Sequence, residues 1–259
     1  MIGCVPGDGA PSVPGSEVAQ VSGYRRPASL DEALALLEHP GTVVIGGGTK
    51  VNAEPRAEPI EVVDLQALGL SAVGRIDGDL LRIGATVTLQ QLVECGDVPA
   101  VIREAARREQ PSTLRAQATI GGSIVTADPE SELLATLLVH DAVVSLAGAA
   151  GPEELTLEAL LAELPFPAGR IVTGVVIDAA GSSFVARAGR TRADRAIVAA
   201  AARVGPDGEQ RVALSGVANT PILVDATDEL EPPGDFRGSS EYRRALAEIL
   251  VARALEALS

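Results

Sequence analysis

The chain has 259 residues, an apolar content of 46%, only two Tyr and three Phe, no Trp, and a formal net charge of -14. This composition argues against disorder and predicts one large or two to three small domains with an aliphatic core. The charge disfavours nucleic acid and anionic membranes as partners. No apolar run is long enough to span a bilayer, and the N-terminus lacks the pattern of a signal peptide, so we expect a cytoplasmic protein.

The cysteines and histidines offer little for metal or nucleophilic chemistry. Cys4 and Cys95 lack the clustered spacing of a metal or iron–sulfur site, so we expect two unpaired cytosolic thiols. His39 and His140 have no partner at ligand spacing and are interpreted as structural. The sequence therefore predicts no metal site, and it identifies no catalytic residue.

The predicted elements alternate along the chain. Residues 1–22 are rich in Gly, Pro and Ser, which predicts a flexible extension. Ser29 is a suitable N-cap for the first helix, and Glu32 completes a capping box. A hairpin is expected around Asp77-Gly78-Asp79, and Thr88 is expected to cap a helix.

The remaining elements follow from apolar periodicity. We expect further helices at residues 100–108, 132–138, 155–164 and 240–258, and strands at residues 43–45, 60–65, 80–85, 142–146, 171–177, 183–188 and 211–217. The last of these helices is expected to be amphipathic. Residues 193–204 fit either a helix, because they are rich in Ala, or a strand, because Ile197-Val198 would sit well in a sheet.

Two glycine-rich segments are the most informative motifs. Gly46-Gly47-Gly48-Thr49 and Gly121-Gly122-Ser123 each follow a short apolar run, which predicts a buried strand that ends in a tight loop. Glycine permits positive φ and a close approach of the backbone to a ligand, and converging N–H groups suit a pyrophosphate. For either segment alone, an ordinary turn is favoured by roughly two to one. Together they predict a grip on one phosphorylated ligand.

The order of several motifs resembles the FAD-binding subunit of molybdenum hydroxylases. This family includes the medium subunit of carbon monoxide dehydrogenase and the flavin domain of xanthine dehydrogenase. The matching residues are Tyr24, Arg26-Pro27, Leu30, Glu32-Ala33, Gly46-Gly47-Gly48-Thr49, Ile83-Gly84-Ala85, Arg115, Ala118-Thr119-Ile120-Gly121-Gly122, Leu214-Ser215-Gly216-Val217-Ala218, Thr220-Pro221 and Tyr242-Arg243. The resemblance covers nearly everything after residue 22.

The resemblance implies an α+β fold with two subdomains of the PCMH type that clasp FAD, followed by a small C-terminal α/β domain. The expected boundaries are 1–22 for the extension, 23–78 for the first FAD-binding subdomain, 79–180 for the second, and 181–259 for the C-terminal domain.

The resemblance also assigns the cofactor contacts. The implied FAD-binding residues are Gly46, Gly47, Gly48, Thr49 and Lys50 in the first loop, and Thr119, Gly121, Gly122 and Ser123 in the second. Glu132 matches an Asp that holds the adenosine part, Val172 matches a residue lining the flavin ring, and Arg187 matches a frequent basic position. Replacement of Gly47 or Gly122 by Val is expected to abolish FAD binding while largely keeping the fold.

Several positions depart from the family pattern. Ser123 replaces an Asn, Glu132 an Asp and Arg170 a Glu, and residues 109–111 offer no aromatic to cover a flavin ring. The resemblance implies an oxidoreductase subunit that relays electrons from iron–sulfur clusters to an acceptor, with an iron–sulfur subunit and a molybdenum-cofactor subunit as partners. The alternatives are a stand-alone biosynthetic enzyme, with or without flavin, acting on an apolar substrate as a homo-oligomer, and a non-catalytic assembly protein.

Overall fold

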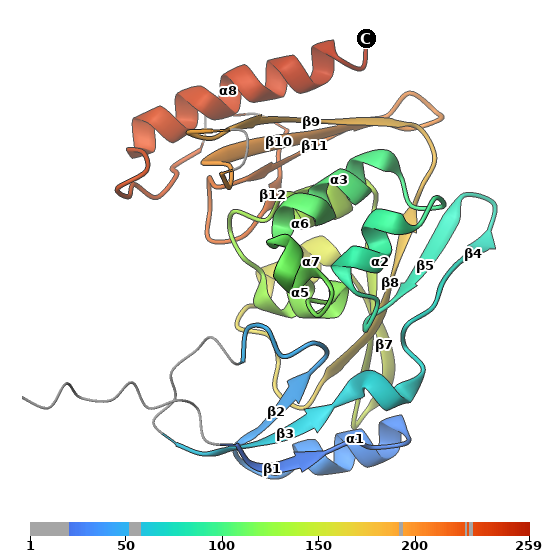
Figure 1. Cartoon of the computed structure of the whole chain (residues 1–259). Coiled ribbons are helices and arrows are strands. Elements are labelled where there is room, and N and C mark those ends of the chain that lie inside the picture. The colour runs from blue at the N-terminus through green and yellow to red at the C-terminus, as the bar shows by residue number, and fades with distance from the viewer. Residues whose placement is uncertain (1–20, 52–57, 192–193, 226, 228–229) are drawn as a thin grey trace, which may run out of the picture.

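A computed structural model describes residues 21–51, 58–191, 194–225, 227 and 230–259. These residues form three sheets, which are stacked from one end of the molecule to the other with helices between and outside them (Figure 1). Most of the expected flexible extension lies outside the described residues. Its last two residues, Val21 and Ser22, belong to the first strand instead.

The first sheet is parallel and small. It has the order β1-β3-β2, formed by Val21–Arg25, Ile60–Asp64 and Thr42–Ile45. Helix α1, Leu30–Leu37, packs on it, and the Ser29 side chain accepts a hydrogen bond from the Glu32 N–H, as predicted. A short 3-10 helix, Leu65–Leu68, follows β3. We call β1, α1, β2 and β3 the first lobe. The first glycine loop follows Ile45 directly, at the carboxyl end of β2.

The second sheet is antiparallel, with five strands in the order β4-β5-β8-β6-β7. Their bounds are Val73–Asp77, Leu80–Gly84, Ile171–Asp178, Val143–Gly148 and Gly151–Thr156. The hairpin predicted around Gly78 is confirmed, and it places β4 in this sheet rather than in the first one.

Helices α2, α3, α5, α6 and α7 lie between the second and third sheets, and α4 packs against α2 (Figure 1). Their bounds are Leu89–Glu94 for α2, Ala100–Glu109 for α3, Ser112–Arg115 for α4, Ile120–Thr126 for α5, Glu132–Val139 for α6 and Leu157–Ala162 for α7. The predicted Thr88 cap is confirmed, with Gln91 completing a capping box. Every residue of α6 is buried, because the helix contacts α3 and α7 as well as the third sheet.

The third sheet has the order β12-β11-β10-β9, with bounds Ile222–Leu223, Gln210–Ser215, Val198–Val204 and Ser182–Ala188. Helix α8, Ser240–Glu256, covers its outer face, and α6 covers the inner one (Figure 1). The ambiguous Ala-rich segment is therefore a strand from Val198 onward. It is buried from Val198 to Arg203 and pairs with a neighbour on each side, so small side chains allow both helices to pack closely.

The second glycine segment is not a loop, which corrects the sequence prediction. Gly121 and Gly122 lie in the first turn of α5, capped by Thr119, whose side chain accepts a hydrogen bond from the Gly122 N–H at 3.2 Å. In the first segment, only Gly48 has a positive φ, of 70°. The glycines thus act mainly by leaving room for backbone contact rather than by adopting left-handed conformations.

Candidate functional site

A pocket of about 900 Å³ lies between the first lobe and the helices that cover the second sheet. This volume falls within the range of small-molecule and cofactor sites. Its walls come from residues 37, 39–51 and 65 on one side, and from residues 85–86, 109–110, 118–119, 121–123, 125–126, 128–129 and 166–172 on the other. The pocket therefore joins segments that are far apart in the sequence.

The structure brings most of the sequence-predicted residues to this pocket. The lining includes Gly46, Gly47, Gly48, Thr49, Lys50, Thr119, Gly121, Gly122, Ser123 and Val172. It does not include Glu132 or Arg187. These two side chains bind each other instead, with 2.7 Å between Arg187 Nε and Glu132 Oε1, and Glu132 is only 5% exposed.

The first glycine loop offers unused hydrogen-bond donors. Within the described part of the chain, none of the backbone N–H groups from Gly46 to Lys50 donates a hydrogen bond. Lys50 adds an ammonium group to the same wall, and its charge acts on Asp128. Several free N–H groups next to a cation form a suitable binding site for an anion.

The start of α5 differs from the first loop in this respect. The N–H groups of Ile120 and Gly121 donate to the carbonyls of Val87 and Ala85, and that of Gly122 donates to the Thr119 side chain. The second segment therefore provides a fixed wall and the Ser123 hydroxyl, whereas most of the free backbone donors belong to the first segment.

Some pocket residues were missed by the sequence prediction. Phe166 contributes an aromatic ring from the segment between α7 and β8. Asp128 and Glu109 contribute carboxyl groups from the end of α5 and the end of α3. No sequence signal separates these residues from ordinary loop and helix positions, because their distance from the glycine segments along the chain conceals their closeness in space.

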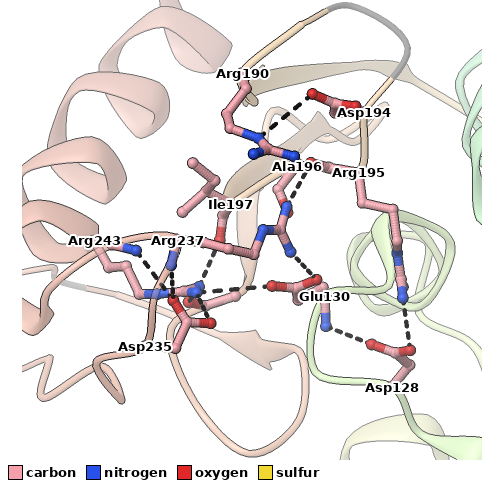
Figure 2. Close-up of polar contacts among 12 residues, drawn as sticks. Asp128, Glu130, Arg190, Asp194, Arg195, Ala196, Ile197, Asp235, Arg237 and Arg243 are labelled. Carbon is pink, nitrogen blue, oxygen red and sulfur yellow. Dashed lines mark hydrogen bonds and ion pairs between the residues drawn. The ribbon is translucent and has the colours of Figure 1, made fainter.

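Asp128 connects the pocket to the third sheet. Its carboxylate binds Arg195 with 2.9 Å between Oδ2 and Nη1 (Figure 2). Although burial alone would raise the pKa of Asp128, the hydrogen bond and charge of Arg195 hold it below its usual value. This ion pair fixes the rim of the pocket to the segment between β9 and β10.

Arginine side chains extend this connection to the start of α8 (Figure 2). Arg237 forms an ion pair with Glu130 and donates to the carbonyls of Arg195 and Ala196. Arg243, only 3% exposed, binds Asp235 with 2.7 Å between Nη2 and Oδ2. The third sheet is thereby attached rigidly beside one end of the pocket.

Comparisons with known proteins agree on one family. Residues 18–178 match the model described as the FAD binding domain in molybdopterin dehydrogenase. Protein YgfM of Escherichia coli is 32% identical over 248 residues, covering 88% of this chain and 93% of YgfM. The carbon monoxide dehydrogenase medium chain of Afipia carboxidovorans is 26% identical over 273 residues, covering 90% of this chain and 95% of that one.

The fold agrees with a solved member. Carbon monoxide dehydrogenase from Hydrogenophaga pseudoflava superposes with a TM-score of 0.84 at 22% identity, over 93% of this chain and 98% of that one. The family match and the named relatives, together with this fold, identify the chain as a flavoprotein component of an oxidoreductase. The chain belongs to the family of FAD-binding domains of molybdopterin dehydrogenases, and FAD is its cofactor.

The residues present fit this cofactor on structural grounds. The free N–H groups of Gly46–Lys50 and the Lys50 ammonium suit a diphosphate. The hydroxyl oxygens of Thr42 and Thr86 on the pocket walls are buried without a hydrogen-bond partner among the described residues, although such groups are normally satisfied. No described helix is long and apolar enough to cross a membrane.

Proposed function

We propose that this protein is the electron-relaying subunit of a molybdenum-hydroxylase-type oxidoreductase, with FAD held in the pocket between the first lobe and α5. In this role it receives electrons from iron–sulfur clusters of a partner subunit, and a molybdenum-cofactor subunit oxidises the substrate. The predicted FAD contacts on the pocket walls belong to this proposal, whereas Glu132 and Arg187 pair with each other outside the pocket lining. The predicted domain boundaries also belong to it, with β4 counted in the second subdomain, as does a cytoplasmic location.

The observation that carries the proposal is the first glycine loop with its unused N–H groups and Lys50, set against the wall of α5. Bound FAD would supply the redox chemistry, because flavin cofactors accept and donate electrons. The chain's own residues would bind the cofactor and orient it. Gly46–Lys50 and Ser123 would hold the diphosphate, and the Phe166 and Val172 side chains would exclude water from an adjoining part of the pocket.

Two observations support the proposal that this chain works with partner subunits: the name of a relative, and the absence of a metal-binding cluster among the described residues. The matching carbon monoxide dehydrogenase chain is a medium chain. Within the described residues, no group of three or more His, Cys, Asp or Glu side chains could hold a metal ion. A partner would thus have to bring the substrate-oxidising centre. A stable assembly would bury on the order of a thousand Å² or more.

The first experiment tests the cofactor role. The purified protein is denatured and any released flavin is identified, and flavin-free protein is titrated with FAD and with FMN. We expect FAD to bind and FMN to bind far more weakly, since one terminal phosphate cannot replace the diphosphate. A colourless protein that takes up no added FAD would favour the stand-alone enzyme that works without flavin.

The second experiment tests the relay role. The chain is co-expressed with candidate iron–sulfur and molybdenum subunits from neighbouring genes and purified through a tag on this chain. We expect the three to copurify and the isolated chain to oxidise no substrate. Substrate turnover by the isolated chain would contradict the relay role and support the stand-alone alternative.

A further inference from the structure

Three carboxyl groups lie close together where α3, α5 and α6 meet, and they differ in their partners. Glu132 binds Arg187 at 2.7 Å, and Asp128 binds Arg195 at 2.9 Å. Glu109 forms no ion pair with any side chain in the described parts of the chain. A buried carboxyl without a cation is unusual, because ionised groups are seldom buried unless they are paired.

Glu109 is held firmly at the wall of the pocket. It is the last residue of α3, lines the pocket and is only 8% exposed. The fully buried Ser131 hydroxyl donates to Glu109 Oε2 at 2.9 Å while accepting from the Leu134 N–H at 3.0 Å. Ser131 is thus fixed by its own capping role in α6, and it fixes the Glu109 carboxyl in turn.

The surroundings of Glu109 favour its neutral form. Burial raises its pKa to about 7, against the opposing effect of the Ser131 hydrogen bond. The nearby charge of Arg195 and a hydrogen bond from the Leu133 N–H also lower the pKa, whereas the charge of Asp128 raises it. Near neutral pH, a large fraction of the protein therefore carries a proton on Glu109.

This proton matters for an anionic ligand. Among the described residues, the charged side chains on the pocket wall are Lys50, Arg170, Asp128 and Glu109, and Arg170 is bound to Glu153 and Glu163. An ionised Glu109 would add a second negative charge to a wall that must accept a diphosphate. A neutral Glu109 would remove this repulsion and could donate a hydrogen bond.

We propose that Glu109 contacts bound FAD as a carboxylic acid, donating a hydrogen bond to it, so that one proton enters the site together with the cofactor. This inference rests on the proposed function and assigns a binding role to a side chain outside the glycine motifs. The proton comes from solvent when FAD binds and returns to solvent when FAD leaves.

The other ionisable groups around Glu109 limit how the test is designed. They are Arg108 on α3, Glu132 on α6, Arg187 on β9, Asp128 and Glu130 between α5 and α6, Arg195 before β10, and Lys50 and His39 on the opposite wall. Glu132 is paired with Arg187. His39 is a histidine on the opposite pocket wall, so a variant at this position serves as a separate control.

The experiment measures FAD affinity of flavin-free protein by fluorescence titration between pH 6 and pH 8.5. If only the protonated form binds tightly, the apparent Kd rises with the ionised fraction, and we expect the affinity to fall about thirtyfold over this range. Calorimetric titration near pH 7 in buffers of different ionisation enthalpy should show an uptake of about half a proton per FAD. This second readout uses the unchanged protein.

Three variants assign the effect to one side chain. Glu109→Gln keeps an acceptor for Ser131 and carries a permanent donor, so we expect tight binding that no longer depends on pH. Glu104→Gln changes an exposed carboxylate on the same helix that pairs with Arg107 and Arg108, and it should behave like the unchanged protein. His39→Gln should retain the pH dependence.

The outcomes separate this inference from the proposed function. FAD binding with a flat pH profile and no proton uptake would overturn the role of Glu109 and leave the proposed function standing. If the pH dependence of FAD affinity persists in Glu109→Gln and disappears in His39→Gln, the role of Glu109 is also overturned and the proposed function still stands. Failure of the unchanged protein to bind FAD at any pH would overturn the proposed function and this inference with it.

Discussion

A Cβ atom placed on Gly47 would lie 1.7 Å from the carbonyl oxygen of Gln117. The first glycine loop and the segment that leads into α5 therefore pack backbone against backbone. A backbone carbonyl cannot move aside as a flexible side chain can. The lack of a side chain at Gly47 thus allows two walls of the pocket to pack closely, in addition to any contact that Gly47 makes with the cofactor.

Gly47→Ala should therefore weaken the fold and FAD binding together. The methyl group forces the two segments apart, and we expect the free energy of unfolding to fall by about 1–3 kcal/mol. Thermal or urea unfolding of the flavin-free protein checks this result. Unchanged stability would show that the loop can shift without loss, and it would restore the sequence-based expectation that the fold tolerates this position.

Gly122→Val should separate binding from folding. A Cβ atom there would meet only the Thr119 hydroxyl oxygen, at 3.2 Å, and Gly122 is exposed on the helix turn that lines the pocket. We expect stability to change by less than about 1 kcal/mol, since Gly is the poorer helix former. FAD affinity, measured by fluorescence titration, should be lost. Equal affinity would remove this turn from the site.

Arg203→Met should destabilise the junction between the second and third sheets. Arg203 is 3% exposed, binds Asp141 at 2.8 Å and also pairs with Asp178. Removing it takes the cation away from Asp178 and leaves Asp141 with Arg211 alone. Because both acids are partly exposed, we expect a loss of about 2–4 kcal/mol in urea unfolding, somewhat below that of a fully buried pair.

Arg211→Met provides the matched control for Arg203. It removes a partner of the same Asp141, at 3.0 Å, but the Arg211 side chain is 36% exposed. Exposed ion pairs contribute little, so the loss should be below about 1 kcal/mol. Similar losses in both variants would mean that burial does not decide the strength of this network.

Glu109→Gln should stabilise the flavin-free protein in a pH-dependent way. Folding raises the pKa of Glu109 from its usual 4.5 to about 7, so the folded state binds more protons than the unfolded state between these values. The contribution of Glu109 to stability is thus least unfavourable at low pH and worsens as pH rises through this window. The variant should gain about 1–3 kcal/mol more at pH 8 than at pH 5.

Melting curves of the unchanged protein, Glu109→Gln and Glu104→Gln at both pH values check this prediction. Glu104→Gln serves as the control because its carboxylate is exposed on the same helix. A gain for Glu109→Gln that is equal at the two pH values would contradict the raised pKa.

Two threonines next to the second sheet should respond in opposite directions to loss of a hydroxyl. Thr86 Oγ1 is buried without a partner in the described structure, whereas Thr173 Oγ1 donates to the Ser145 carbonyl at 3.1 Å. Thr86→Val should leave the flavin-free protein as stable or more stable, and Thr173→Val should cost about 1 kcal/mol. Urea unfolding of both variants measures the difference, and a larger loss for Thr86→Val would reveal an unseen partner.

Local sequence signals determined much of the fold. Ser29 and Thr88 cap helices as predicted, because capping depends on residues only three positions apart. The Asp77-Gly78-Asp79 turn joins two paired strands for the same local reason. The order of the glycine segments and of the C-terminal motifs Leu214-Ser215-Gly216-Val217-Ala218 and Tyr242-Arg243 was sufficient to indicate the family, since each motif is contiguous in the chain.

The tertiary structure alone decided the features that depend on distant neighbours. The Ala-rich residues from Val198 form a strand because β9 and β11 supply hydrogen bonds on both sides, which overrides helix propensity. Gly121 and Gly122 are helical because their helix packs against Ala85. A Cβ atom on Gly121 would lie only 2.8 Å from the Ala85 carbonyl oxygen. Glu109 became a pocket residue only when folding buried it beside Ser131, with no ion-pair partner among the described residues, an environment created by segments more than twenty residues apart.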